Sequence, residues 1–136
     1  MIFLKRFKSF AIFFAFGALG YGLIELLWRG HTHWSMLTLG GICFTAFGKI
    51  SSFFKNTCLL YKSIMASVFV TFAEFIYGVI FNIILKKNVW DYSLIPFNFK
   101  GQICLLYSVF WWILSLIFIP VADIFNKRLQ NSKKVL

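Results

Sequence analysis

The stretch SIMASVFVTFAEFIYGVIFNIIL, from Ser63 to Leu85, decides the fold class of this chain. Glu74 is its single charged residue, and nearly everything else in it is apolar or small. A helix that crosses a bilayer needs about 20 predominantly apolar residues, and its backbone groups must all be hydrogen-bonded internally. The stretch therefore predicts a transmembrane helix that carries a carboxyl group near its middle.

Three further apolar stretches of similar length lie on either side of this one. They run from about 7 to 28, from 35 to 54 and from 103 to 125. A polar loop at about 29–34 separates the first span from the second, and one at about 86–102 separates the third from the fourth. Over the whole chain 60% of the residues are hydrophobic and 13% are charged, whereas a soluble domain has roughly 25% charged residues. We expect one all-α integral membrane domain, residues 1–136, with four transmembrane helices.

The basic residues predict how these spans are oriented. Ten lie beside the termini or beside the connection between the second and third spans: Lys5, Arg6, Lys8, Lys49, Lys55, Lys62, Lys127, Arg128, Lys133 and Lys134. Four lie beside the other two loops: Arg29, Lys86, Lys87 and Lys100. The positive-inside rule then places both termini in the cytoplasm, and we expect the chain in a bacterial plasma membrane. Because these charges sit at span ends, the expected partner is the lipid bilayer and no nucleic acid.

Two other properties of the chain bear on processing and cofactors. The segment MIFLKRFK with the apolar run after it resembles a signal peptide, but the run continues to Trp28, so we expect it to be retained. The three cysteines have no CxxC spacing and the only histidines are His31 and His33, so neither a disulfide, a metal site nor a cofactor is predicted.

An internal repeat relates the two halves of the chain. YGLIELLWRGHTHWS, from Tyr21, resembles YGVIFNIILKKNVWDYS, from Tyr77, and GGICF, from Gly40, resembles GQICL, from Gly101. The repeat predicts two tandem helical hairpins of equal orientation, a parallel repeat.

Small and polar residues recur at helical spacing within the spans. In the third span they are Ser67, Thr71, Glu74 and Asn82, and in the first they include Ala11, Ala15, Ala18 and Gly22. Small residues let helices approach closely in lipid, so these faces are expected to meet inside the bundle. The residues of the third span are also candidates for an intramembrane polar path.

Glu74 has two interpretations. An ionisable group within a span is a candidate functional site, because burying it costs free energy, but a hydrogen-bonded glutamate can equally hold helices together. Glu25 lies nearer a span end and has Arg29 four residues further on, which predicts a local ion pair.

The loops at about 29–34 and 86–102, which the positive-inside rule places outside the cytoplasm, are the outer loops. These loops and the adjacent helix ends contain most of the remaining polar residues. A candidate outer-face site there comprises Glu25, Arg29, His33, Trp34, Trp90, Asp91, Tyr92, Ser93 and Asn98. Its aromatic residues can alternatively be ordinary interfacial residues, or the second loop can fold back into the bundle as a re-entrant segment. Neither a Ser-His-Asp order nor a carboxylate pair is evident, so no catalytic residue is predicted.

Two stretches that include these loops carry a family signature: YGLIELLWRGHTHWSMLTLGGICF, from Tyr21, and AEF with NVWDYSLIPFNFKGQICLLYSVFWW, from Ala73 and Asn88. On these stretches the chain resembles a bacterial family of ABC transporter permeases, type IV or CmpB-like. The positions that this resemblance implicates are Glu25, Arg29, Gly30, His33, Trp34, Ser35, Gly40, Gly41, Glu74, Asn82, Trp90, Asp91, Tyr92, Ser93, Pro96, Asn98 and Gly101. The resemblance implies a transport-related membrane component.

Two alternatives remain beside transport: an enzyme that modifies a lipid or its headgroup, using Asp91, His33 and Glu25, and an accessory or structural membrane protein. The chain has no GxxxxGK[ST] phosphate loop. With four spans, a transporter of this kind needs a homodimer or another membrane or ATPase subunit to complete it.

Overall fold

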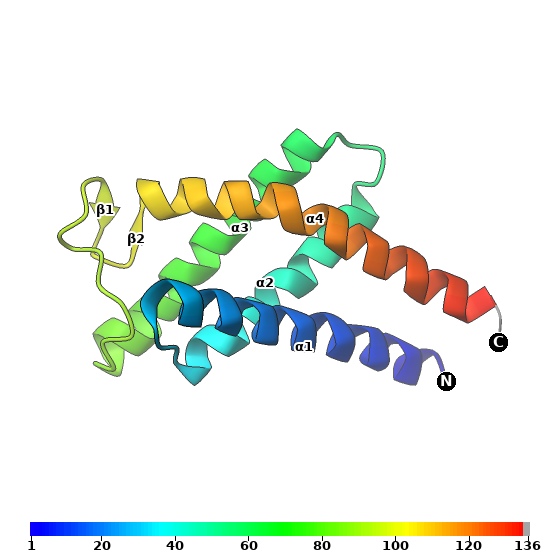
Figure 1. Ribbon diagram of the computed structural model, residues 1–136, viewed down its shortest axis with the longest axis horizontal. Coiled ribbons are helices and arrows are strands. Elements are labelled where there is room, and N and C mark those ends of the chain that lie inside the picture. The colour runs from blue at the N-terminus through cyan, green and yellow to red at the C-terminus, as the bar shows by residue number, and fades with distance from the viewer. Residues whose placement is uncertain (135–136) are drawn as a thin grey trace.

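A computed structural model describes residues 1–134 of the chain, and these residues fold mainly into four long helices (Figure 1). They are α1 (Ile2–Arg29), α2 (Trp34–Phe53), α3 (Leu59–Gly78), which continues as the π-helix η1 (Val79–Ile84), and α4 (Leu105–Lys134). Two short antiparallel strands, β1 (Asn98–Phe99) and β2 (Ile103–Cys104), pair in the last loop. All four helices are long and apolar enough to span a membrane, which confirms the predicted fold class.

The helix ends differ from the predicted span ends. α1 begins at Ile2 rather than near residue 7, α3 begins at Leu59 rather than 63, and α4 continues to Lys134 rather than ending near 125. Hydropathy marks the part of a helix that crosses the bilayer, but helical hydrogen bonding continues into the headgroup region beyond it. At the other end of α4, residues 103 and 104 belong to β2 because they pair with β1.

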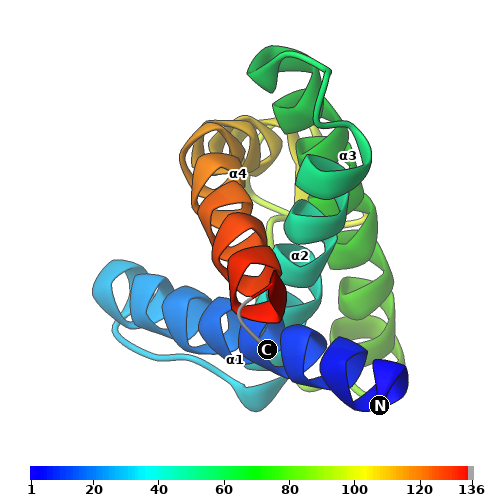
Figure 2. The same ribbon diagram turned by 90° about the vertical axis from the view of Figure 1, so that its right-hand side faces the viewer.

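The helices form two hairpins that pack side by side. α1 packs on α2, α3 packs on α4, and α2 lies against both members of the second hairpin. The start of α1, the end of α4 and the α2–α3 connection lie at one end of the molecule (Figure 1). We call the opposite end, which carries residues 30–33 and 85–104, the loop end. In the end-on view α1 crosses the bundle below α4 (Figure 2), and the two helices meet through large aromatic side chains such as Phe16 and Phe125.

The first hairpin turns within a few residues because its ends are well capped. Gly30 adopts a left-handed conformation with φ 77°, and its N–H donates to Leu26 O at 3.0 Å. Glycine favours this conformation because it has no Cβ to clash. The ring Nδ1 of His33 then accepts from Ser35 N at 3.2 Å and caps α2.

The α1–α2 contact is closest where two glycines meet. A Cβ placed on Gly40 would lie 2.8 Å from Gly17 O and 2.4 Å from the Tyr21 Cβ, so only glycine fits. On the predicted face of the first span Gly22 and Glu25 are buried, but Ala11 and Ala15 are exposed, which corrects its first half. The buried face runs instead through Phe13 and Gly17, because large rings fill the space beside the glycines.

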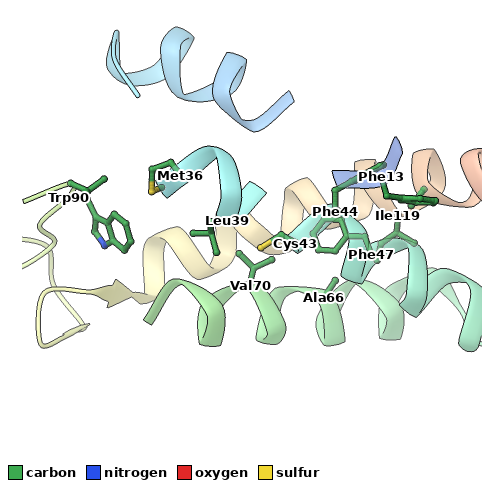
Figure 3. Packing of buried hydrophobic residues seen from close by; sticks show 12 residues of the cluster. Phe13, Met36, Leu39, Cys43, Phe44, Phe47, Ala66, Val70, Trp90 and Ile119 are labelled. Carbon is green, nitrogen blue, oxygen red and sulfur yellow. The ribbon is translucent and has the colours of Figure 1, made fainter. Parts of the chain in front are cut away.

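The core lies along α2. Its buried residues include Met36, Leu39, Cys43, Phe44 and Phe47, which form one cluster with residues of the other three helices (Figure 3). The Trp90 indole of the last loop lies beyond Met36 at the loop end of the same cluster, so loop and bundle share one core (Figure 3).

The two halves of the sequence repeat have different local structures. GGICF lies within α2, whereas GQICL spans a turn and β2. Tyr21 donates to Glu25 four residues on, whereas Tyr77 bonds to Thr38 of α2 at 3.2 Å. The five-residue insertion in the second copy accompanies the loop that replaces the start of a helix.

Candidate functional site

Glu74 joins three elements at the loop end of the bundle. It lies on α3 and is only 1% exposed. Its Oε1 accepts a hydrogen bond of 2.8 Å from the Tyr92 hydroxyl of the loop, and its Oε2 accepts one of 2.9 Å from Trp111 Nε1 of α4. Both carboxyl oxygens therefore act as acceptors, and neither is left without a partner at this buried position.

The loop between η1 and α4, residues 85–104, has an irregular but extensively bonded backbone. Lys86, Asn88, Phe97 and Lys100 all have positive φ values between 49° and 57°. Such values are uncommon for residues other than glycine, and they persist where surrounding contacts hold them. Hydrogen bonds from three helices supply those contacts.

Asn82, on η1, holds the first part of this loop. Its Oδ1 accepts from Val89 N at 2.7 Å and from Trp90 N at 3.4 Å, and its Nδ2 donates to Gln102 Oε1 at 2.8 Å. The Trp90 indole donates to Gln102 O at 2.9 Å and is buried. The loop consequently folds back beside the last turns of the third span, as a re-entrant segment would.

Glu25 and Arg29 pair on α1, as the sequence predicts, and Arg29 also reaches the loop. Arg29 Nε lies 2.6 Å from Glu25 Oε2, and the Tyr21 hydroxyl donates to Glu25 Oε1 at 3.0 Å. Arg29 Nη1 donates to Val89 O at 2.9 Å. Within residues 1–134, Nη2 is buried without a hydrogen-bond partner.

A cavity of about 260 Å³ lies among α1, α4 and the loop. Glu25 and Arg29 line it together with seven aromatic residues, which are Tyr21, Trp28, Trp90, Tyr92, Tyr107, Phe110 and Trp111. Several of these rings contact one another: Tyr92 stacks on Tyr107 at 4.7 Å between centroids, and Tyr107 meets Phe110 edge to face at 5.6 Å.

The cavity borders the lipid-facing surface and a second, apolar cavity. Trp28 and Ile113 line it and are 67% and 45% exposed. The second cavity, of about 70 Å³, shares Tyr21, Ile24, Trp111 and Leu114 with the first and extends toward Phe44 and Phe47. An amphiphile could therefore place a polar group near Glu25 and an apolar part between α1 and α4.

Other predicted outer-face residues build the loop rather than line this cavity. Asp91 is exposed, and its Oδ1 accepts from Ser93 N at 2.9 Å. Asn98 donates to Ser93 O and Ile95 O, and accepts from Gly101 N at 3.0 Å. These bonds close two turns around β1 and β2, which positions Trp90 and Tyr92 on the inner side.

Two loop groups have shifted pKa values for clear physical reasons. The hydrogen bond from the Ser93 backbone, with a further one from its side chain, holds the pKa of Asp91 below its usual range. Burial raises the pKa of Tyr92, and the adjacent Glu74 carboxyl raises it further. Tyr92 therefore remains a hydrogen-bond donor to Glu74.

The remaining predicted residues lie apart from the cavity. His33 caps α2 and contacts Ser35 Oγ at 2.7 Å, and Trp34 is 60% exposed beside Phe81. Ser67 and Thr71 bond to Ser108 of α4 and so join two helices, while neither cavity at the loop end includes them.

Sequence reasoning missed three residues of the site: Gln102, Tyr107 and Trp111. Trp111 lies in WW within a span, and Gln102 is the one polar residue in GQICL. Buried tryptophan and glutamine usually need hydrogen-bond partners, so either residue could have been paired with Glu74 or Asn82.

Four membrane-spanning helices, with a buried polar cluster under an ordered loop, define a multi-pass membrane protein. The chain belongs to the family described as "Putative ABC-transporter type IV", whose model matches residues 9–136. This confirms the resemblance that the two loop signatures indicate. No match is found among curated proteins or among solved structures.

Proposed function

We propose that this chain is the membrane subunit of a transport system in a bacterial plasma membrane, with both termini in the cytoplasm. The observation that carries the proposal is the double attachment of Glu74. Its carboxyl group links the loop that walls the cavity to two helices of the bundle. A ligand in the cavity would contact Tyr92 and Trp111, and through them would act on a carboxyl group inside the membrane.

The arrangement suits a ligand-dependent switch. A ligand that moves the Tyr92 or Trp111 ring removes a hydrogen bond from a nearly fully buried carboxyl group, which is costly unless the helices rearrange. The ligand thereby favours one arrangement of α3, α4 and the loop over another. A difference in affinity between two such arrangements is what couples binding to movement.

Energy would come from a separate subunit. The sequence has no phosphate loop of the GxxxxGK[ST] type, and the family description names an ABC transporter, a class driven by ATPase subunits. Basic residues cluster at the end that carries the termini, the end that we assign to the cytoplasm, where an ATPase would dock. A second copy of the chain or another membrane subunit would complete the translocation path.

The enzyme alternative has less support. It requires Asp91, His33 and Glu25 to act at one place, but of these three only Glu25 lines the cavity. Asp91 closes an exposed turn and His33 caps a helix.

Gentle purification of the tagged chain from native membranes, followed by mass spectrometry, tests the proposal. We expect an ATPase or a second membrane subunit to be recovered with the wild type and with Glu74→Gln. In liposomes, the wild type should alter the ATP hydrolysis rate of that partner, and Glu74→Gln should weaken the effect, because hydrogen bonds to a neutral amide are weaker than those to an ionisable carboxyl group.

Thr45→Ala is the control, because the Thr45 hydroxyl bonds to Gly41 O within its own helix. It should behave as the wild type. Recovery of the folded chain with no partner subunit would refute the transport role and favour the accessory one.

A further inference from the structure

We infer that the cavity among α1, α4 and the loop binds an organic cation, specifically a substituted ammonium group. The inference names the ligand class of the cavity on which the proposed function rests. It concerns binding alone and requires no partner subunit.

The aromatic lining is the first observation. Ammonium groups are attracted to the electron-rich faces of tryptophan, tyrosine and phenylalanine, and cages of such rings recognise quaternary ammonium ligands. Here three tryptophans, Trp28, Trp90 and Trp111, line the cavity with three tyrosines and a phenylalanine. Tyr92 and Trp111 also donate hydrogen bonds to a carboxyl group, which makes their rings more electron-rich.

The balance of charges is the second observation. Arg29 is paired with Glu25 at 2.6 Å, so its positive charge is already compensated. A second carboxyl group, that of Glu74, lies one hydrogen bond behind the cavity wall. Among the residues that line the cavity, the Glu25 carboxyl group therefore balances the Arg29 guanidinium group, and no lysine lines it in the part of the chain that the structure describes. A lining without net positive charge leaves the aromatic ring faces as its main means of attracting an ion, and these attract a cation; Arg29 Nη2, buried without a hydrogen-bond partner, is the donor that a phosphate or carboxylate ligand would need.

Size and position agree with this ligand class. A cavity of about 150 Å³ can hold benzene, so one of about 260 Å³ has room for a small substituted ammonium group. The adjoining apolar cavity would take an attached hydrocarbon group. Such a ligand could be a free hydrophobic cation or the ammonium headgroup of a membrane lipid that enters past Trp28.

The test uses the purified full-length chain in an uncharged detergent with benzyltrimethylammonium as the probe. Binding is followed by tryptophan fluorescence and calorimetry. Neopentylbenzene, in which carbon replaces the charged nitrogen, is the neutral comparison. We expect saturable binding of the cation at least about tenfold tighter than that of the neutral compound. Equal affinities, or no saturable binding, would overturn the inference.

Two matched tryptophan variants locate the site. Trp28→Leu removes a ring that lines the cavity and is 67% exposed, whereas Trp34→Leu removes one that is 60% exposed and does not line it. Because both rings are largely exposed, both variants should fold. Trp28→Leu should weaken binding about two- to fivefold, as expected for one partly exposed ring, and Trp28→Phe should restore most of it. Equal affinities in Trp28→Leu and Trp34→Leu would refute the location.

Native mass spectrometry of the same samples distinguishes the two ligand sources. A bound lipid with an ammonium headgroup, such as phosphatidylethanolamine, that the probe displaces would identify a lipid as the natural ligand. Probe binding without displacement of a lipid would identify a free cation. If benzyl phosphate displaces the probe more readily than organic cations do, the cavity contains an anion site at Arg29 and the inference is overturned. Loss of probe binding leaves recovery of an ATPase unaffected, so the two proposals can fail separately.

Discussion

The Tyr92 hydroxyl donates a 2.8 Å hydrogen bond to Glu74, although the two residues come from a loop and from the middle of a predicted span. Trp111 donates to the other carboxyl oxygen at 2.9 Å. These bonds tie the loop, α3 and α4 to one buried group, and they make Glu74 a sensitive position for substitution.

We expect Glu74→Gln to fold and Glu74→Leu to be destabilised by roughly 2–5 kcal/mol. In Glu74→Gln the amide oxygen can accept from Trp111 and the amide nitrogen can donate to the Tyr92 oxygen, whereas leucine leaves two buried donors without partners. Thermal unfolding in detergent measures the difference. Equal stabilities of the two variants would show that these hydrogen bonds contribute nothing.

Asn82→Ala should release the start of the loop. The Asn82 side chain accepts from Val89 N and donates to Gln102, so we expect faster hydrogen exchange at Val89 and Trp90 by about tenfold or more. Asn131→Ala is the control because Asn131 is exposed near the end of α4. Unchanged exchange at both amides would contradict the assigned role of Asn82.

Arg29→Met should destabilise the chain by roughly 3–5 kcal/mol, because it leaves the buried Glu25 carboxyl without its cation. Adding Glu25→Leu should recover part of that loss. Arg29→Lys should be intermediate, since lysine can pair with Glu25 but lacks the planar fork that also reaches Val89 O. A double-mutant cycle measures the coupling between the two residues. A coupling energy near zero would mean that the ion pair has no net effect.

Gly40→Ala should push α1 away from α2, because the added Cβ would lie within 3 Å of Tyr21 and Gly17. We expect a loss of about 1–3 kcal/mol. Gly20→Ala is the matched control, with nothing within 4 Å of the new methyl group. It should be neutral or stabilising by up to about 1 kcal/mol, because alanine favours helix over glycine. Thermal unfolding of both variants checks this, and a similar loss in both would exclude close packing as the cause.

Acidification should loosen the turn at Asp91. Its folded-state pKa is lowered chiefly by the Ser93 backbone hydrogen bond, so the stabilisation is present above the ordinary aspartate pKa of about 3.9 and is lost as the pH falls through the lowered value. Intrinsic-rate-corrected hydrogen exchange at the Ser93 amide should show this loss of protection. In Asp91→Asn, which does not titrate, protection should stay constant. A constant protection in the wild type would argue against an ionised Asp91 as the acceptor.

The sequence predicts the spans well because hydropathy measures directly what the bilayer demands. It also predicts the Glu25–Arg29 pair, since residues four apart on a helix are neighbours. Burial of Glu74 follows in the same way, because a carboxyl group cannot face lipid.

The partners of Glu74 and Asn82 could not be predicted from local patterns. They depend on a loop with four non-glycine residues of positive φ, and at three of them, Lys86, Phe97 and Lys100, no local propensity indicates that conformation. The first half of the close face of α1 was also mispredicted, because alanines at regular spacing look like a packing face, whereas Gly17 and Phe13 make the contacts there. Gly22, in the second half, is buried as predicted.

Val89 links α1 to η1 by two main-chain hydrogen bonds, since its N–H donates to Asn82 and its carbonyl accepts from Arg29. A mutational scan that exchanges only side chains would therefore report Val89 as an ordinary packing position. It would overlook the two main-chain hydrogen bonds by which Val89 links the two helices. Only a change to the backbone itself, such as Val89→Pro or an ester in place of the amide, would expose it. At such a position the main-chain hydrogen bonds can be essential even though any apolar side chain of similar size is tolerated.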